Sequence, residues 1–173
     1  MIRIEKISIT ELNTDAIVNA ANEHLLAGGG VCGVIFRAAG YEELQAACDK
    51  IGHCNTGDAV ITPGFRLAAK YVIHAVGPVW YGGRNNEPEL LYGAYVNSLR
   101  RAMEAGCHSI GFPLISSGIY GYPMKGAWEQ AIKACKDFCD ENPEWEIEIV
   151  FAVLSDDVLA AGTEELKNQF NGE

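Results

Sequence analysis

Short segments with the two-residue alternation of strands take turns along this chain with longer segments whose apolar residues recur at helical spacing. Strands are predicted at 1–7, 15–20, 58–62, 71–76, 109–115 and 147–154. Helices are predicted at 30–40, 41–51, 88–105 and 125–141, with a last helix capped by Asp156 or Asp157 and reaching Phe170. Such alternation predicts an α/β fold of three layers, with helices on both sides of a mainly parallel sheet.

Length and charge narrow the class of protein further. A chain of 173 residues lies in the size range of one domain, so 1–173 is expected to form a single unit. The 13 basic and 23 acidic residues give a net charge of −10, which argues against non-specific binding to nucleic acid. The longest apolar run, 149–154, is far shorter than the roughly 20 residues that span a bilayer, so no membrane partner is expected.

The six cysteines form no Cys-x-x-Cys pair. We expect reduced thiols in a cytoplasmic protein, and most of them to be small core residues. Cys135 and Cys139 lie four apart on one predicted helix, but a structural zinc would need two further ligands nearby. The sequence therefore predicts neither a metal nor another cofactor.

Polar and glycine-rich residues follow two of the predicted strands. In α/β sheets ligands bind beyond the carboxyl ends of the strands, so these two segments are the candidate site. In the first, Asn19 and Asn22 precede three consecutive glycines, 28–30, and a helix start, where free N–H groups favour an anion. The alternative is a tight turn in which both asparagines only bond the main chain.

The second segment, at 113–123, again brings small hydroxyl residues and glycines to the start of a helix. It offers a second place for phosphate oxygens, so the two loops could close on a diphosphate from both sides. Tyr120 lies between glycines and could place its ring against a sugar. The alternative is an ordinary connection between a strand and a helix.

Together the two segments resemble those of the macrodomain family, which binds ADP-ribose. The resemblance rests on "DAIVNAANEHLLAGGGVCGVIFRAAG" at 15–40 and "FPLISSGIYGYP" at 112–123, and it extends over nearly the whole chain through "TGDAVIT", "YVIHAVGPVW" and "AYVNSLRRA". The similarity is greatest to the bacterial O-acetyl-ADP-ribose deacetylases, which also remove ADP-ribose from acidic side chains. It implies the macrodomain form of the α/β fold, with a mixed, mainly parallel sheet.

The resemblance also implies residue roles. Asn22 matches the residue that holds the terminal ribose and that many members need for hydrolysis. The other positions that match ligand contacts are Ile9, Asn19, Ala20, Ala21, Gly28, Gly29, Gly30, Val31, Cys32, Leu114, Ser116, Ser117, Gly118, Ile119, Tyr120 and Leu154.

This chain departs from the family pattern at four of its positions. Ser8 stands where an Asp usually accepts a hydrogen bond from adenine, and Leu154 where an aromatic residue often stacks on it. Cys32 and Phe36 replace the Asp and His of the deacetylase branch. Losing a charge-assisted hydrogen bond costs about 1.5–3 kcal/mol, so adenine recognition is weakened or changed.

The function expected from the sequence is hydrolysis of an ester at the terminal ribose of ADP-ribose, either O-acetyl-ADP-ribose or mono-ADP-ribose on an acidic side chain. The expected partners are ADP-ribose or a derivative and mono-ADP-ribosylated proteins. Two alternatives stay open: a binder or sensor of ADP-ribose without catalysis, and a relative with altered nucleotide specificity.

Overall fold

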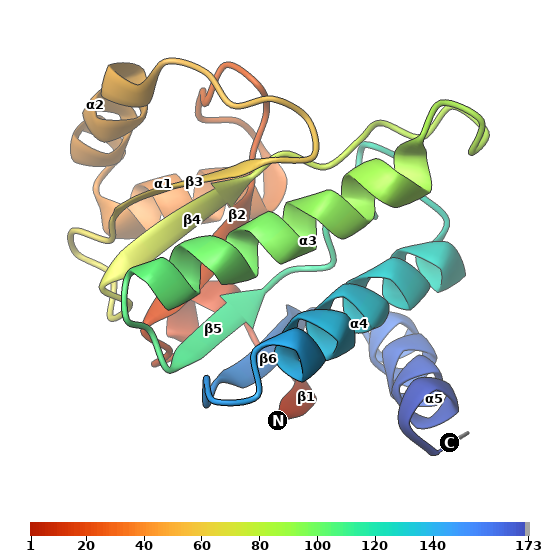
Figure 1. Cartoon of the computed structure of the whole chain (residues 1–173). Coiled ribbons are helices and arrows are strands. Elements are labelled where there is room, and N and C mark those ends of the chain that lie inside the picture. Colours follow the sequence, from red (N-terminus) through yellow and green to blue (C-terminus); the bar gives the residue numbers. More distant parts are fainter. Residues whose placement is uncertain (172–173) are drawn as a thin grey trace.

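The computed structural model describes residues 1–171, which form a six-stranded sheet between two layers of helices (Figure 1). The strands are β1 (Ile2–Lys6), β2 (Ala16–Ala20), β3 (Ala59–Pro63), β4 (Tyr71–Ala75), β5 (Ser109–Phe112) and β6 (Glu148–Val153). The helices are α1 (Gly30–Ala39), α2 (Tyr41–Ile51), α3 (Glu87–Glu104), α4 (Met124–Glu141) and α5 (Asp156–Asn171), with a 3₁₀ turn at Ile9–Glu11.

The strand order across the sheet is β1-β6-β5-β2-β4-β3. Every neighbouring pair is parallel except β3 with β4, which is antiparallel. Parallel strands need crossover connections, and the helices between them supply these connections. The predicted fold, a three-layer α/β domain with a mixed and mainly parallel sheet, is confirmed.

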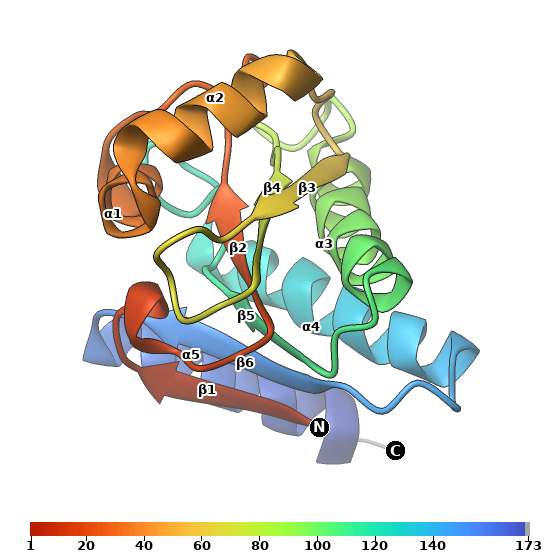
Figure 2. The ribbon, with the colours of Figure 1, turned by 90° about the vertical axis from the view of Figure 1, so that its left-hand side faces the viewer.

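Each face of the sheet has its own core. Helices α3, α4 and α5 cover one face, where large aromatic side chains such as Tyr95, Phe112, Trp128 and Phe151 pack together. Helices α1 and α2 cover the other face, as the turned view shows (Figure 2). Because both faces are covered, the inner strands are apolar almost throughout, as the sequence of β6 indicated.

One predicted boundary and one predicted helix cap are wrong for local reasons. The strand expected at 109–115 ends at Phe112, because Pro113 has no N–H to donate to a neighbouring strand. The last helix begins at Asp156, but the side chain that bonds its first turn is Ser155, whose Oγ accepts from Val158 N at 3.4 Å. Neither aspartate is therefore the cap.

Candidate functional site

The two predicted loops follow β2 and β5, which pair in parallel through Ala16 and Ile110. The carboxyl ends of parallel neighbours lie at the same edge of a sheet (Figure 1). On the far side of β5, strands β6 and β1 end at this edge too, and Ile7 N donates to Val153 O at 3.0 Å. Residues after four neighbouring strands therefore meet along one edge.

Side chains close the first loop, which connects β2 to α1 and comprises residues 21–29. Both ends of the half-buried Asn22 amide bond the main chain of Leu26: Nδ2 donates to its carbonyl at 2.8 Å, and Oδ1 accepts from its N–H at 3.1 Å. Gln45 of α2 fastens the same loop, because its amide donates to Leu25 O and accepts from Ala27 N. The amide of Asn22 is thus fixed in orientation before any ligand binds.

Asn19 lies below this loop in a buried polar network. Its Nδ2 contacts His74 Nδ1 at 3.2 Å and Cys32 Sγ at 3.6 Å, while His74 Nε2 lies 3.0 Å from Thr62 Oγ1. Burial lowers the pKa of His74 to about 4, so the ring is neutral at pH 7. Asn19 Oδ1 is buried without a protein partner, which is rare unless a bound water or ligand supplies one.

The glycine run leaves the start of α1 open. A Cβ placed on Gly28, Gly29 or Gly30 would meet nothing within 4 Å, and no side chain caps the helix at Gly29. The first N–H groups of α1 are thus open to an anion. Cys32 lies in this first turn, almost fully buried, with Sγ 3.8 Å from Leu26 O.

The second loop is closed mainly by its own main chain. Gly121 N donates to Gly118 O at 3.0 Å and Tyr122 N to Ser116 O at 2.9 Å, while Ser117 Oγ donates to Leu114 O at 2.7 Å. Ser116 has a left-handed backbone, with φ of 68°, which is uncommon for a residue other than glycine. Its Oγ is also buried without a protein partner. Backbone strain and unpartnered polar atoms gather at functional sites.

The two loops lie within electrostatic reach of each other. Burial raises the pKa of Tyr120 in the second loop, and the nearby negative charge of Glu23 in the first loop raises it further. Glu23 is held by the N–H and hydroxyl of Thr56, at 3.1 and 3.0 Å, and these bonds lower its pKa. Both predicted loops therefore lie at the edge of the sheet where the neighbouring strands β2 and β5 end.

The residues predicted near adenine lie further along the same edge. Ile9 is buried, Ser8 Oγ lies 3.1 Å from Thr10 Oγ1, and Leu154 has 71% of its surface exposed. Leu154 directly follows β6, and Ser8 lies two residues after the end of the neighbouring strand β1, so both positions lie at this edge. Leu154 supplies an apolar but non-aromatic surface at the end of β6.

Sequence reasoning missed two contributors to this edge. Gln45 gave no signal, because a single glutamine on an amphipathic helix is usually a solvated residue. Glu87 also passed unnoticed, although it is a buried carboxylate at the start of α3. His74, in the middle of β4, is buried and has partners at both ring nitrogens.

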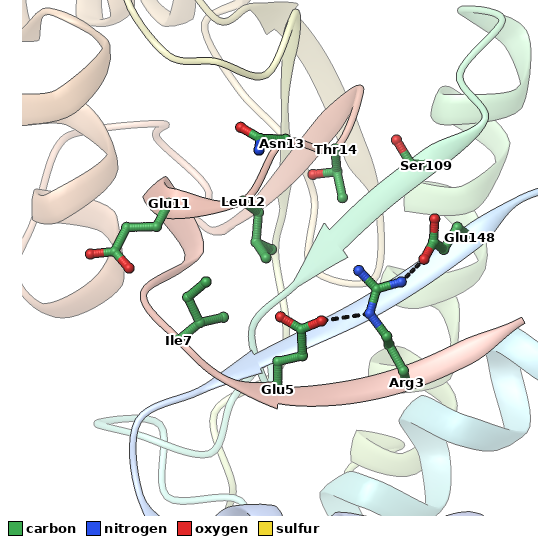
Figure 3. A pocket seen from close by; sticks show the side chains of 9 residues that line it. All are labelled: Arg3, Glu5, Ile7, Glu11, Leu12, Asn13, Thr14, Ser109 and Glu148. Atoms are coloured by element: carbon green, nitrogen blue, oxygen red, sulfur yellow. Dashed lines mark hydrogen bonds and ion pairs between the residues drawn. The ribbon is translucent and has the colours of Figure 1, made fainter.

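A separate polar hollow of about 300 Å³ shares no residue with either loop (Figure 3). Its lining includes Arg3, which pairs with Glu5 and Glu148, together with Glu11 and Asn13. Within residues 1–171 no three His, Cys, Asp or Glu side chains are grouped as metal ligands would be. None of the helices in this range is long and apolar enough to cross a bilayer.

Comparison with known proteins agrees with this geometry. Residues 18–131 match the family model described as the Macro domain. An O-acetyl-ADP-ribose deacetylase of Escherichia fergusonii is 54% identical over 134 residues, which cover 75% of each chain. The Oceanobacillus iheyensis macrodomain, solved with ADP, has a TM-score of 0.93 and 36% identity over 99% of this chain and 93% of its own.

A Trypanosoma brucei macrodomain, solved in complex with ADP-ribose, has a TM-score of 0.87 and 37% identity over 94% of this chain and 68% of its own. The matched segment of the family model contains both loops, and the structural match extends over nearly the whole chain. On sequence and structure alike, this chain belongs to the Macro domain family.

Proposed function

We propose that this protein binds ADP-ribose across the two loops and hydrolyses an ester at its terminal ribose. The ester is either O-acetyl-ADP-ribose or ADP-ribose carried on an acidic side chain of a protein. The observation that supports this most is a pair of loops that follow neighbouring parallel strands, the first with an open helix start, in a chain so similar to O-acetyl-ADP-ribose deacetylases. We further propose that the whole chain, 1–173, acts as one such domain in the cytoplasm.

Main-chain groups hold the diphosphate in this proposal. The open N–H groups at the start of α1, after Gly28–30, face one side of it, and the loop from Ser116 to Tyr120 faces the other. A helix N-terminus stabilises an anion without a cationic side chain, which suits a chain with a net charge of −10. Ser117, Gly118 and the exposed Ile119 form the outer part of the second loop.

Asn22 orients the terminal ribose. Its bonds to Leu26 leave one amide hydrogen and one lone pair for a ribose hydroxyl or an attacking water. Ala20 and Ala21 bring their main chain close to the sugar, and Asn19 supplies the buried oxygen that lacks a partner. Water adds to the ester carbonyl carbon, and the ribose oxygen leaves with a proton, so preorganised N–H groups would stabilise the charge that develops.

Cys32 distinguishes this site from the sites of family members that have a carboxylate at the same position. Without a carboxylate to orient or activate the water, positioning and main-chain charge stabilisation must provide most of the rate. We therefore expect slow turnover. The same residue motivates the second candidate, a sensor that binds ADP-ribose and releases it unchanged.

The experiment is hydrolysis of O-acetyl-ADP-ribose and of a mono-ADP-ribosylated acceptor by the wild type and by Asn22→Ala. We expect turnover to fall at least 100-fold in the variant, about 2.7 kcal/mol of lost transition-state stabilisation. Asn13→Ala, which removes an exposed amide outside the two loops, should retain the wild-type rate. Equal rates for wild type and Asn22→Ala would overturn the catalytic proposal, and binding without turnover would favour the sensor.

A further inference from the structure

Glu87 is a carboxylate at the start of α3 that is only 1% exposed and has no cationic partner among its hydrogen bonds. Its Oε2 accepts from Tyr81 N at 2.7 Å and from Gly83 N at 3.0 Å, and its Oε1 accepts from Asn85 N at 2.6 Å. These bonds hold its pKa below the usual range although burial alone would raise it. One side chain thus fixes the segment 80–86, which we call the Trp80 loop.

The Trp80 loop is bound in turn to the second ligand loop. Trp80 N donates to Tyr120 O at 2.8 Å, next to the position where Glu87 holds Tyr81. The Trp80 ring also contacts the Tyr122 ring, with centroids 4.6 Å apart. Tyr122 N closes the second loop by donating to Ser116 O. A continuous chain of contacts therefore leads from Glu87 to both ends of the Ser116–Tyr120 segment.

The Trp80 ring has little freedom to move within this arrangement. Gly83 has a φ of 87°, and a Cβ at Gly83 would lie 2.8 Å from Trp80 Cη2, so the ring packs on the bare main chain of its own loop. Gly83 is also one of the three donors to Glu87. The carboxylate therefore holds both the main chain of Trp80 and the surface on which its ring rests.

From these contacts we infer that Glu87 is a positioning residue for ligand binding: it sets the geometry of the Ser116–Tyr120 loop through Trp80. This inference rests on the proposed function for the identity of the ligand. Glu87 itself touches neither ligand nor reacting atoms. A glutamine in its place turns one acceptor end into a donor that faces main-chain N–H groups, so at least one of the three bonds is lost.

The test compares Glu87→Gln with Glu89→Gln, which removes a charge from an exposed carboxylate in the same helical turn. Binding of ADP-ribose is measured by calorimetry at 25 °C, after circular dichroism has established that both variants fold at this temperature. We expect the Kd to rise at least tenfold for Glu87→Gln and less than twofold for Glu89→Gln.

A spectroscopic measurement separates positioning from a general loss of stability. In protein labelled with 5-fluorotryptophan, the three tryptophans give three ¹⁹F signals, and Trp80→Phe identifies the one from Trp80. In Glu87→Gln we expect the Trp80 signal to shift or broaden while those of Trp128 and Trp145 keep their positions. A globally loosened protein would move all three signals.

Two results would overturn the inference: an unmoved Trp80 signal in Glu87→Gln, or a displaced signal with unchanged ADP-ribose affinity. If wild-type protein binds no ADP-ribose, the proposed function fails instead. Hydrogen exchange at the amides of Trp80 and Tyr122 then still decides whether Glu87 orders the second loop. Faster exchange at both amides in Glu87→Gln, but not in Glu89→Gln, would support that ordering, and equal exchange would refute it.

Discussion

The two ligand loops reach the same edge of the sheet by different means. The first is held by side chains: Asn22 and Gln45 bond its main chain, and below it Asn19 and His74 belong to a buried polar network. The second is held mainly by its own main chain, with a left-handed Ser116, and from outside by the Trp80 loop that Glu87 fixes. Polar side chains therefore act directly on the first loop, whereas Glu87 acts on the second only through Trp80, and tight packing at Ser116 makes the second loop sensitive to added volume.

The largest expected effect is a loss of stability at low pH, when protonation of His74 disrupts the polar network under the first loop. The pKa of His74 is about 4 in the folded protein and about 6.5 when exposed, so the unfolded chain binds the proton more tightly. The stability from keeping the ring neutral is complete above pH 6.5 and is lost as the pH falls toward 4. We expect the free energy of unfolding to drop by about 2 kcal/mol between pH 7.5 and pH 5.

Urea unfolding at the two pH values measures this drop. His74→Gln, whose amide can still bond Asn19 and Thr62 but does not titrate, is the matched control and should lose most of the pH dependence. An equal drop in wild type and variant would show that other groups cause it.

A steric change should break the second loop. A Cβ at Gly77 would lie 2.2 Å from Ser116 Oγ and 2.5 Å from Ile115 Cγ2, so Gly77→Ala forces this loop to move. We expect thermal or urea unfolding to show a loss of about 1–3 kcal/mol and calorimetry to show weaker ADP-ribose binding. In Gly118→Ala the added methyl meets nothing within 4 Å, so stability should change by less than about 0.5 kcal/mol. Equal stability losses in both variants would contradict the packing argument.

The two loops also differ in how much of each could be predicted from the sequence. Strand and helix periodicity predicted all six strands and five helices, and the glycines with Asn22 marked the first loop. The family resemblance supplied the roles of individual residues, which no spacing within the chain could give. The Glu87 bonds and the left-handed Ser116 were out of reach, because both depend on the conformation of irregular loops, which no periodicity in the sequence specifies.

A smaller effect is expected on the hydrolysis rate when the residue at position 32, next to the first loop, is changed. Cys32→Asp places a carboxylate beside the bonded Leu26 and Asn19, where it can orient or activate water. We expect the rate of O-acetyl-ADP-ribose hydrolysis to rise about tenfold, while Cys32→Asn, of similar size but uncharged, keeps the wild-type rate. A rise in both variants, or in neither, would argue against a missing base as the limit on turnover.

The smallest expected effect concerns Ser116. Ser116→Gly removes a strained side chain and a buried hydroxyl without a partner, so we expect a gain in the free energy of unfolding of up to about 1 kcal/mol. Ser116→Ala removes the hydroxyl but keeps a Cβ at positive φ, and should gain less. Thermal unfolding compares the two, and a loss of stability in Ser116→Gly would indicate that the hydroxyl has a bonding partner.

The most direct measurement of the central claim, that both loops hold one diphosphate ligand, is calorimetric titration with ADP-ribose, AMP and ribose 5-phosphate. Only ADP-ribose presents a diphosphate between two sugars, so it should bind at least tenfold more tightly than either fragment. Affinity for AMP equal to that for ADP-ribose, or no binding of ADP-ribose, would contradict the account.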